Sequence, residues 1–96
     1  LSQMVVDALI ELPGLDVSIE HDYKNYLIPN AVFRFTKDWD GPSRDTVLER
    51  MKHGETPVYL YWLCGPDTLA VDPLNVDEKE MQVVISRLLQ ELTKKD

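Results

Sequence analysis

The chain has 96 residues, 44% of them hydrophobic, which is enough for one domain with a modest core. It carries 10 basic and 17 acidic residues, a formal net charge of −7. It therefore lacks the excess of Lys and Arg by which proteins bind nucleic acid or anionic membranes. No apolar run approaches the roughly 20 residues that span a bilayer. The single cysteine, Cys64, excludes an internal disulfide and fits a cytoplasmic location.

The first third of the chain predicts one helix and one strand. Apolar residues recur at helical spacing over residues 1–12, and Pro13 and Gly14 then end the helix. Residues 15–20 alternate between apolar and polar side chains, which is typical of a half-buried strand. Residues 26–28 are expected to form a short extended piece after a polar turn.

The middle of the chain predicts a second strand and a second helix. In residues 31–36, Ala31, Phe33 and Phe35 share one face, while Val32, Arg34 and Thr36 share the other. Ser43 is then a suitable N-cap for a short helix. The expected core side chains of that helix are Val47, Leu48 and Met51.

The last third contains the clearest pattern. Two apolar runs, residues 57–63 and 68–71, are separated by turn residues and predict a pair of strands. Asp77 and Glu80 then have the spacing of a capping box. The helix that follows presents an apolar face, with the apolar residues at the spacing i, i+3, i+4, i+7 and i+11: Met81, Val84, Ile85, Leu88 and Leu92.

These elements predict an α+β fold in the order αββαββα. We expect a sheet of about four antiparallel or mixed strands, with helices mainly on one face. The strand over residues 57–63 is apolar on both faces and should therefore be covered on both sides. The hypothesis is that part of this surface docks on another domain or subunit.

The residues that could carry chemistry each have a simpler structural interpretation. Cys64 precedes Gly65-Pro66 as in a redox loop, but Asp67 occupies the place of the second cysteine, which favours a strand-end residue. His21 and His53 lie in different loops, with no spacing that indicates a zinc site. Arg34 could bind a substrate carboxylate, or could pair with an acidic side chain across the sheet.

Two further patterns are weak. Asp38, Asp40 and Glu49 have part of the spacing of a calcium loop, but Ser43 stands where that loop needs glycine. A turn is the simpler interpretation. The aromatic residues Trp39, Tyr59, Tyr61 and Trp62 could stack on bases, but the acidic charge favours a core or interface role.

Three blocks of sequence resemble a known family. Residues 51–59 contain Gly54-Glu55-Thr56-Pro57, residues 69–75 contain Asp72-Pro73, and residues 78–92 form the final amphipathic helix. This order resembles the C-terminal end of fold-type I pyridoxal-phosphate (PLP) enzymes. Within these it is most similar to the seryl-tRNA selenium transferase-related group, which includes aminosugar-acid ammonia-lyases.

The resemblance implies that the chain is the small C-terminal domain of a larger PLP-dependent lyase or transferase, which fits a first residue that is Leu1 rather than Met. In that family the cofactor lysine lies in the large domain, so the chain itself would bind no cofactor. The implied partner is that large domain or another subunit, and the implied parent is a homo-oligomer. Many relatives place a substrate-binding Arg where this chain has Tyr61, and Arg34 is the alternative candidate for that contact. The other reading is a stand-alone α+β module that binds a small ligand or a protein.

Overall fold

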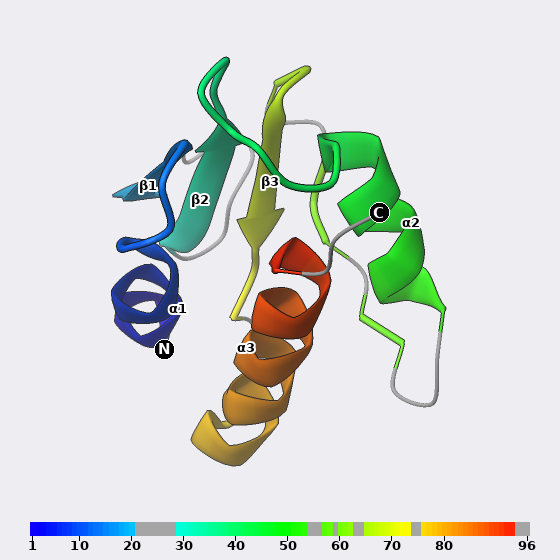
Figure 1. Cartoon of the computed structure of the whole chain (residues 1–96). Helices are drawn as coiled ribbons and strands as arrows, with labels where there is room; N and C mark the ends of the chain where they lie inside the picture. Colours follow the sequence, from blue (N-terminus) through cyan, green and yellow to red (C-terminus); the bar gives the residue numbers. More distant parts are fainter. Residues whose placement is uncertain (21–28, 54–56, 59, 63–64, 74–75, 94–96) are drawn as a thin grey trace.

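The computed structural model describes residues 1–20, 29–53, 57–58, 60–62, 65–73 and 76–93. In chain order these residues form the following elements: α1 (Ser2–Leu9), β1 (Leu15–Glu20), β2 (Asn30–Phe35), α2 (Arg44–Lys52), β3 (Thr68–Val71) and α3 (Glu78–Leu92). The fold class is therefore α+β, as the sequence predicts (Figure 1).

The three strands of the described residues form one antiparallel sheet in the order β1-β2-β3. Phe33 of β2 lies opposite Val17 on one side and Leu69 on the other, which fixes the register. Beyond β3, Tyr61 forms a bridge with Ala70, and each backbone N–H donates to the other's carbonyl at 2.9 Å. Because side chains alternate along a strand, Tyr61, Ala70, Val32 and Ser18 share one face of the sheet.

The helices pack on the other face (Figure 1). α3 contacts both α1 and α2, so the three helices form one layer with α3 in the middle. The odd-numbered residues of β2, Ala31, Phe33 and Phe35, belong to the core between the helices and the sheet. No helix of the described residues covers the opposite face, although Val32 and Ala70 on that face are buried. We refer to that opposite face, with Asp16, Ser18, Val32, Arg34 and Ala70, as the helix-free face.

The third helix begins where its sequence predicts and ends at Leu92. The Asp77 carboxylate accepts a hydrogen bond from the Glu80 backbone N–H at 2.7 Å, and the Glu80 side chain completes the capping box. The predicted apolar face is confirmed, because Met81, Leu88 and Leu92 are buried and Val84 and Ile85 pack against them. Ser43 likewise caps α2, and the predicted core residues of α2 are buried.

Two predicted elements differ in extent. α1 ends at Leu9 rather than at Leu12, and a turn leads to Gly14, which has a φ of 87°. A side chain at Gly14 would meet the backbone of Trp39, with Cβ only 2.5 Å from its Cα, so this close approach requires glycine.

The second difference concerns the predicted fourth strand. Within the described residues the run 57–63 forms only the bridge at Tyr61, so the sheet there has three strands rather than four. The carbonyl of Trp62 accepts a hydrogen bond from the Arg44 side chain instead of from a neighbouring strand. Residues 26–28, the other short extended piece, lie outside the described residues.

Candidate functional site

Arg34 lies on the helix-free face, where it pairs with an acidic side chain on the neighbouring strand. Its Nη2 is 3.2 Å from the Asp16 Oδ2, and these two residues lie directly opposite each other in β2 and β1. The side chains of Arg34 and Asp16 are 54% and 64% exposed, so the pair contributes little to stability and leaves the guanidinium accessible. The sequence allows two roles for Arg34, and the structure shows one of them, the ion pair with an acidic side chain across the sheet. A role of Arg34 in substrate binding stays a prediction.

Tyr61 lies on the same face of the sheet as Arg34. The two residues are on either side of β3, because Arg34 lies opposite Thr68 and Tyr61 lies opposite Ala70. Two strand spacings separate them laterally, which corresponds to about 10 Å. The structure thus brings the two predicted substrate-binding residues to one face of the sheet. They do not lie on neighbouring strands, because β3 runs between them.

Arg44 is an important side chain that the sequence analysis does not identify. It lies in the first turn of α2, and its guanidinium donates to the carbonyls of Trp62, Thr68 and Gly65 at 2.6, 3.3 and 3.4 Å. These carbonyls are 18 to 24 residues away along the chain, so no local pattern could indicate them. With a side chain only 15% exposed, Arg44 attaches α2 to the segment that leads into β3.

A second arginine connects two helices. The Arg87 Nη2 of α3 donates to the carbonyls of Arg50 and His53 at 3.0 and 3.1 Å. Carbonyls at the end of a helix have no partner within the helix and attract positive charge. Arg87 therefore stabilises the C-terminal end of α2 against α3.

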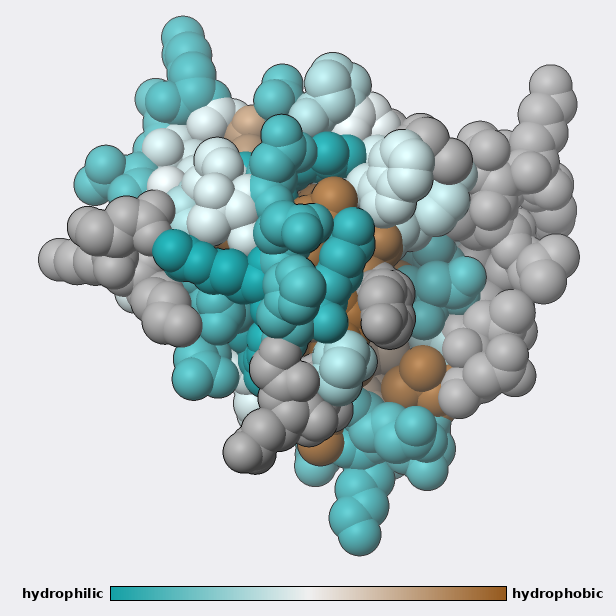
Figure 2. Space-filling view, turned by 90° about the vertical axis from the view of Figure 1, so that its right-hand side faces the viewer, coloured by the Kyte–Doolittle hydropathy of each residue, from teal (hydrophilic) through white to brown (hydrophobic). Residues whose placement is uncertain are grey.

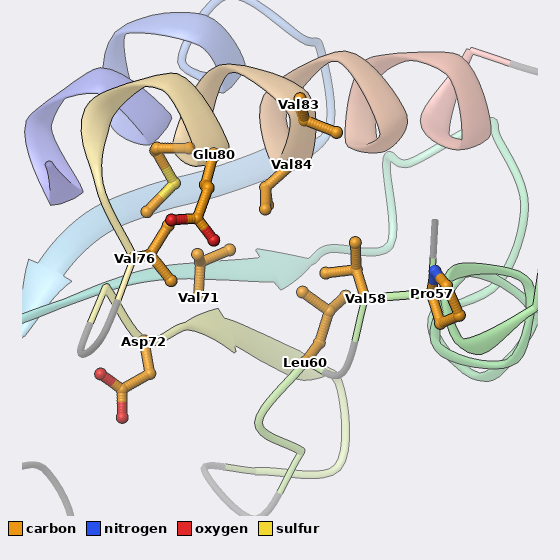
Figure 3. Close-up of a pocket in the computed structure, with 10 residues that line it drawn as sticks. Pro57, Val58, Leu60, Val71, Asp72, Val76, Glu80, Val83 and Val84 are labelled. Atoms are coloured by element: carbon orange, nitrogen blue, oxygen red, sulfur yellow. The ribbon is translucent and has the colours of Figure 1, made fainter. Parts of the chain in front are cut away.

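A groove of about 450 Å³ lies between α3, the end of β3 and residues 57–60 (Figure 3). Its walls are mainly apolar: Pro57, Val58, Leu60, Val71, Val76, Met81, Val83 and Val84. Two carboxylates, Asp72 and Glu80, complete the described lining, which contains no basic side chain. We refer to this feature as the α3 groove.

The surface on the side of α2 is more polar. Figure 2 shows mostly hydrophilic side chains there, with apolar atoms exposed between them near the centre of the view. Trp62, whose carbonyl binds Arg44, is 47% exposed and is one of five large hydrophobic residues that are exposed in the described part of the chain.

The remaining candidates form no site within the described residues. His53 is exposed and lies 3.6 Å from the Glu49 carboxylate, whereas His21 and Cys64 lie outside the described residues. In the described ranges, no group of three or more His, Cys, Asp or Glu side chains could hold a metal ion. The described lysines, Lys37, Lys52 and Lys79, lie in a loop or on helix surfaces, and none is buried.

The comparisons with known proteins add no relative to this description. No protein-family model matches the chain, and neither a curated protein nor a solved structure matches it. Among the helices that the structure describes, none is long and apolar enough to cross a membrane. The resemblance to PLP enzymes therefore stays a prediction.

Proposed function

We propose that this chain is the C-terminal small domain of a PLP-dependent lyase or transferase of the selenium transferase-related group. In this proposal the domain covers a cofactor site that is held by a separate large domain, and it has no activity alone. The sequence support is the resemblance of residues 51–59, 69–75 and 78–92 to that family. The structural observation that carries the proposal is the single helix layer, because no described helix covers the other face of the sheet.

The helix-free face is the surface that we propose for the contact with the large domain. Arg34 and Asp16 are exposed on it, Val32 and Ala70 are buried on it, and Tyr61 lies at its edge. In the assembled enzyme, Arg34 would be available to a substrate carboxylate, and Tyr61 would occupy the place of the family's arginine. We further propose that residues 57–63 form the fourth strand of the sheet in that assembly, as a continuation of the Tyr61 bridge.

The rest of the proposal follows from the same resemblance. The parent enzyme is a cytoplasmic homo-oligomer, and its large domain supplies both the lysine and the phosphate-binding loop for PLP. This chain supplies neither. The described lysines support that division, because each is solvent-accessible and lacks the buried surroundings of a cofactor lysine.

The test uses the isolated chain together with its gene. We expect the chain to retain no PLP after dialysis, and we expect the reading frame upstream of Leu1 to encode a large domain with a cofactor lysine. Stoichiometric retention of PLP by the isolated chain would contradict the proposal. So would a start codon directly before Leu1.

A stand-alone module that binds a small ligand or a protein is the second candidate function. The specific observation that favours it is the α3 groove, because pockets of 300–1,000 Å³ with mainly apolar walls are typical small-molecule sites. A start codon directly before Leu1 would favour this candidate over the first.

A further inference from the structure

The α3 groove has the size and walls of a small-molecule site. Its volume of about 450 Å³ falls within the range of ligand pockets, and it is formed by elements far apart in sequence. Val58 and Leu60 form one wall, and Val84 on α3 points toward them from the other (Figure 3). Between these walls, the body of a ligand would meet mainly apolar side chains.

The polar groups of the groove have one sign of charge. The Glu80 carboxylate is directed from α3 toward the strands, beside Val76 and Val71, while Asp72 follows directly after β3 (Figure 3). The described lining has no basic side chain, and the whole chain has a net charge of −7. Such a site attracts cations and disfavours anions.

We propose that the α3 groove binds a small organic cation, with an aliphatic or aromatic body and an ammonium or guanidinium group at one end. The body contacts Val58, Leu60 and Val84, and the cationic group lies at the Glu80 carboxylate. The volume of the groove favours a small molecule over a macromolecular partner. This assignment does not depend on the PLP enzyme proposed above.

Three probes of similar size test the proposal by NMR titration of the backbone amides. We expect n-hexylammonium to shift the amides of Val58, Leu60 and Val84 and to bind at least about three-fold more tightly than hexanol. Hexanoate should not bind detectably. Equal affinity for all three probes, or shifts outside the groove, would overturn the proposal. Tighter binding of a Leu- and Lys-containing peptide than of hexylammonium would assign the groove to a protein partner instead.

Two matched variants separate the charge of Glu80 from its role in the helix. Glu80→Gln removes the charge but keeps a side chain that completes a capping box, so α3 should remain folded. We expect this variant to bind hexylammonium about three-fold more weakly and hexanol unchanged. The control is Glu78→Gln, which removes a charge from the same first turn outside the described lining of the groove. An equal loss of affinity in both variants would show that general charge, rather than the groove, governs binding, and would overturn the assignment.

Discussion

Two polar side chains that are largely buried, Arg44 and Asn30, differ in their partners. Arg44 lies where α2 meets the start of β3, and its guanidinium donates to three backbone carbonyls. Asn30 lies at the start of β2 and is fully buried. Within the described residues, neither the oxygen nor the nitrogen of its amide has a hydrogen-bond partner.

This difference has a physical consequence. A buried polar group with partners is near neutral or stabilising, whereas one without partners costs about 1–3 kcal/mol. We therefore expect the stability of the chain to fall when Arg44 is replaced by an apolar residue. Replacement of Asn30 by an apolar residue should not lower it. Substitutions of Arg44 and Asn30 test the two sides of this comparison, and a substitution of Asp77 separates the effect of a hydrogen bond from that of burial.

Arg44→Met should have the largest effect. The variant keeps a long apolar side chain but removes the guanidinium donor from the carbonyls of Trp62, Gly65 and Thr68, of which Gly65 keeps the Thr68 backbone N–H at 3.4 Å. We expect a loss of about 2 kcal/mol in the free energy of unfolding, measured by urea denaturation. The matched control is Arg34→Met, because the ion pair of Arg34 with Asp16 is exposed and its loss should change stability by less than about 0.5 kcal/mol. Equal losses in the free energy of unfolding of the two variants would show that the hydrogen bonds from Arg44 to the carbonyls do not stabilise the fold more than the exposed ion pair of Arg34 does.

Asp77→Ala should cost about 1 kcal/mol, because it removes the acceptor for the Glu80 backbone N–H. This side chain is exposed yet has a partner, so it separates the effect of the hydrogen bond from that of burial. Urea denaturation should show a lower midpoint with an unchanged slope. An unchanged midpoint would mean that water replaces the cap at no cost.

Asn30→Leu should raise the stability of the chain by about 1 kcal/mol, because it replaces a buried amide that has no partner among the described residues by an apolar group of similar size. The companion variant Asn30→Asp should lower stability, since it places a charge at the same buried position. Thermal and urea unfolding of both variants provide the measurement. Destabilisation by Asn30→Leu would show that the amide has a partner, such as a buried water molecule.

Features of the fold that depend on residues close together in the sequence are predicted correctly, whereas features that depend on distant residues are not. The start of α3 is predicted correctly because Asp77 and Glu80 interact over three residues. The core face of β2 is also predicted correctly, because alternation along one strand determines it. The end of α1 is not predicted correctly. The turn that follows α1 leads to Gly14, which closely approaches the backbone of Trp39, a residue far along the chain.

The candidate site was less predictable for the same reason. Arg44 sits in an ordinary first turn of a helix, and only the fold brings the carbonyls of Trp62, Gly65 and Thr68 to it. The α3 groove likewise forms between Leu60 and Val84, which no local pattern connects. The sequence indicates Arg34 as a candidate binding residue, but its pairing with Asp16 depends on the register of β1 and β2.

The central proposal, that this chain is the small domain of a PLP enzyme, is tested most directly on the native protein. An antibody raised against the chain can recover that protein from its source for measurement of intact mass and bound PLP. We predict a polypeptide several times heavier than the 11.1 kDa of this chain, with PLP attached. A native species of 11.1 kDa without PLP would contradict the proposal.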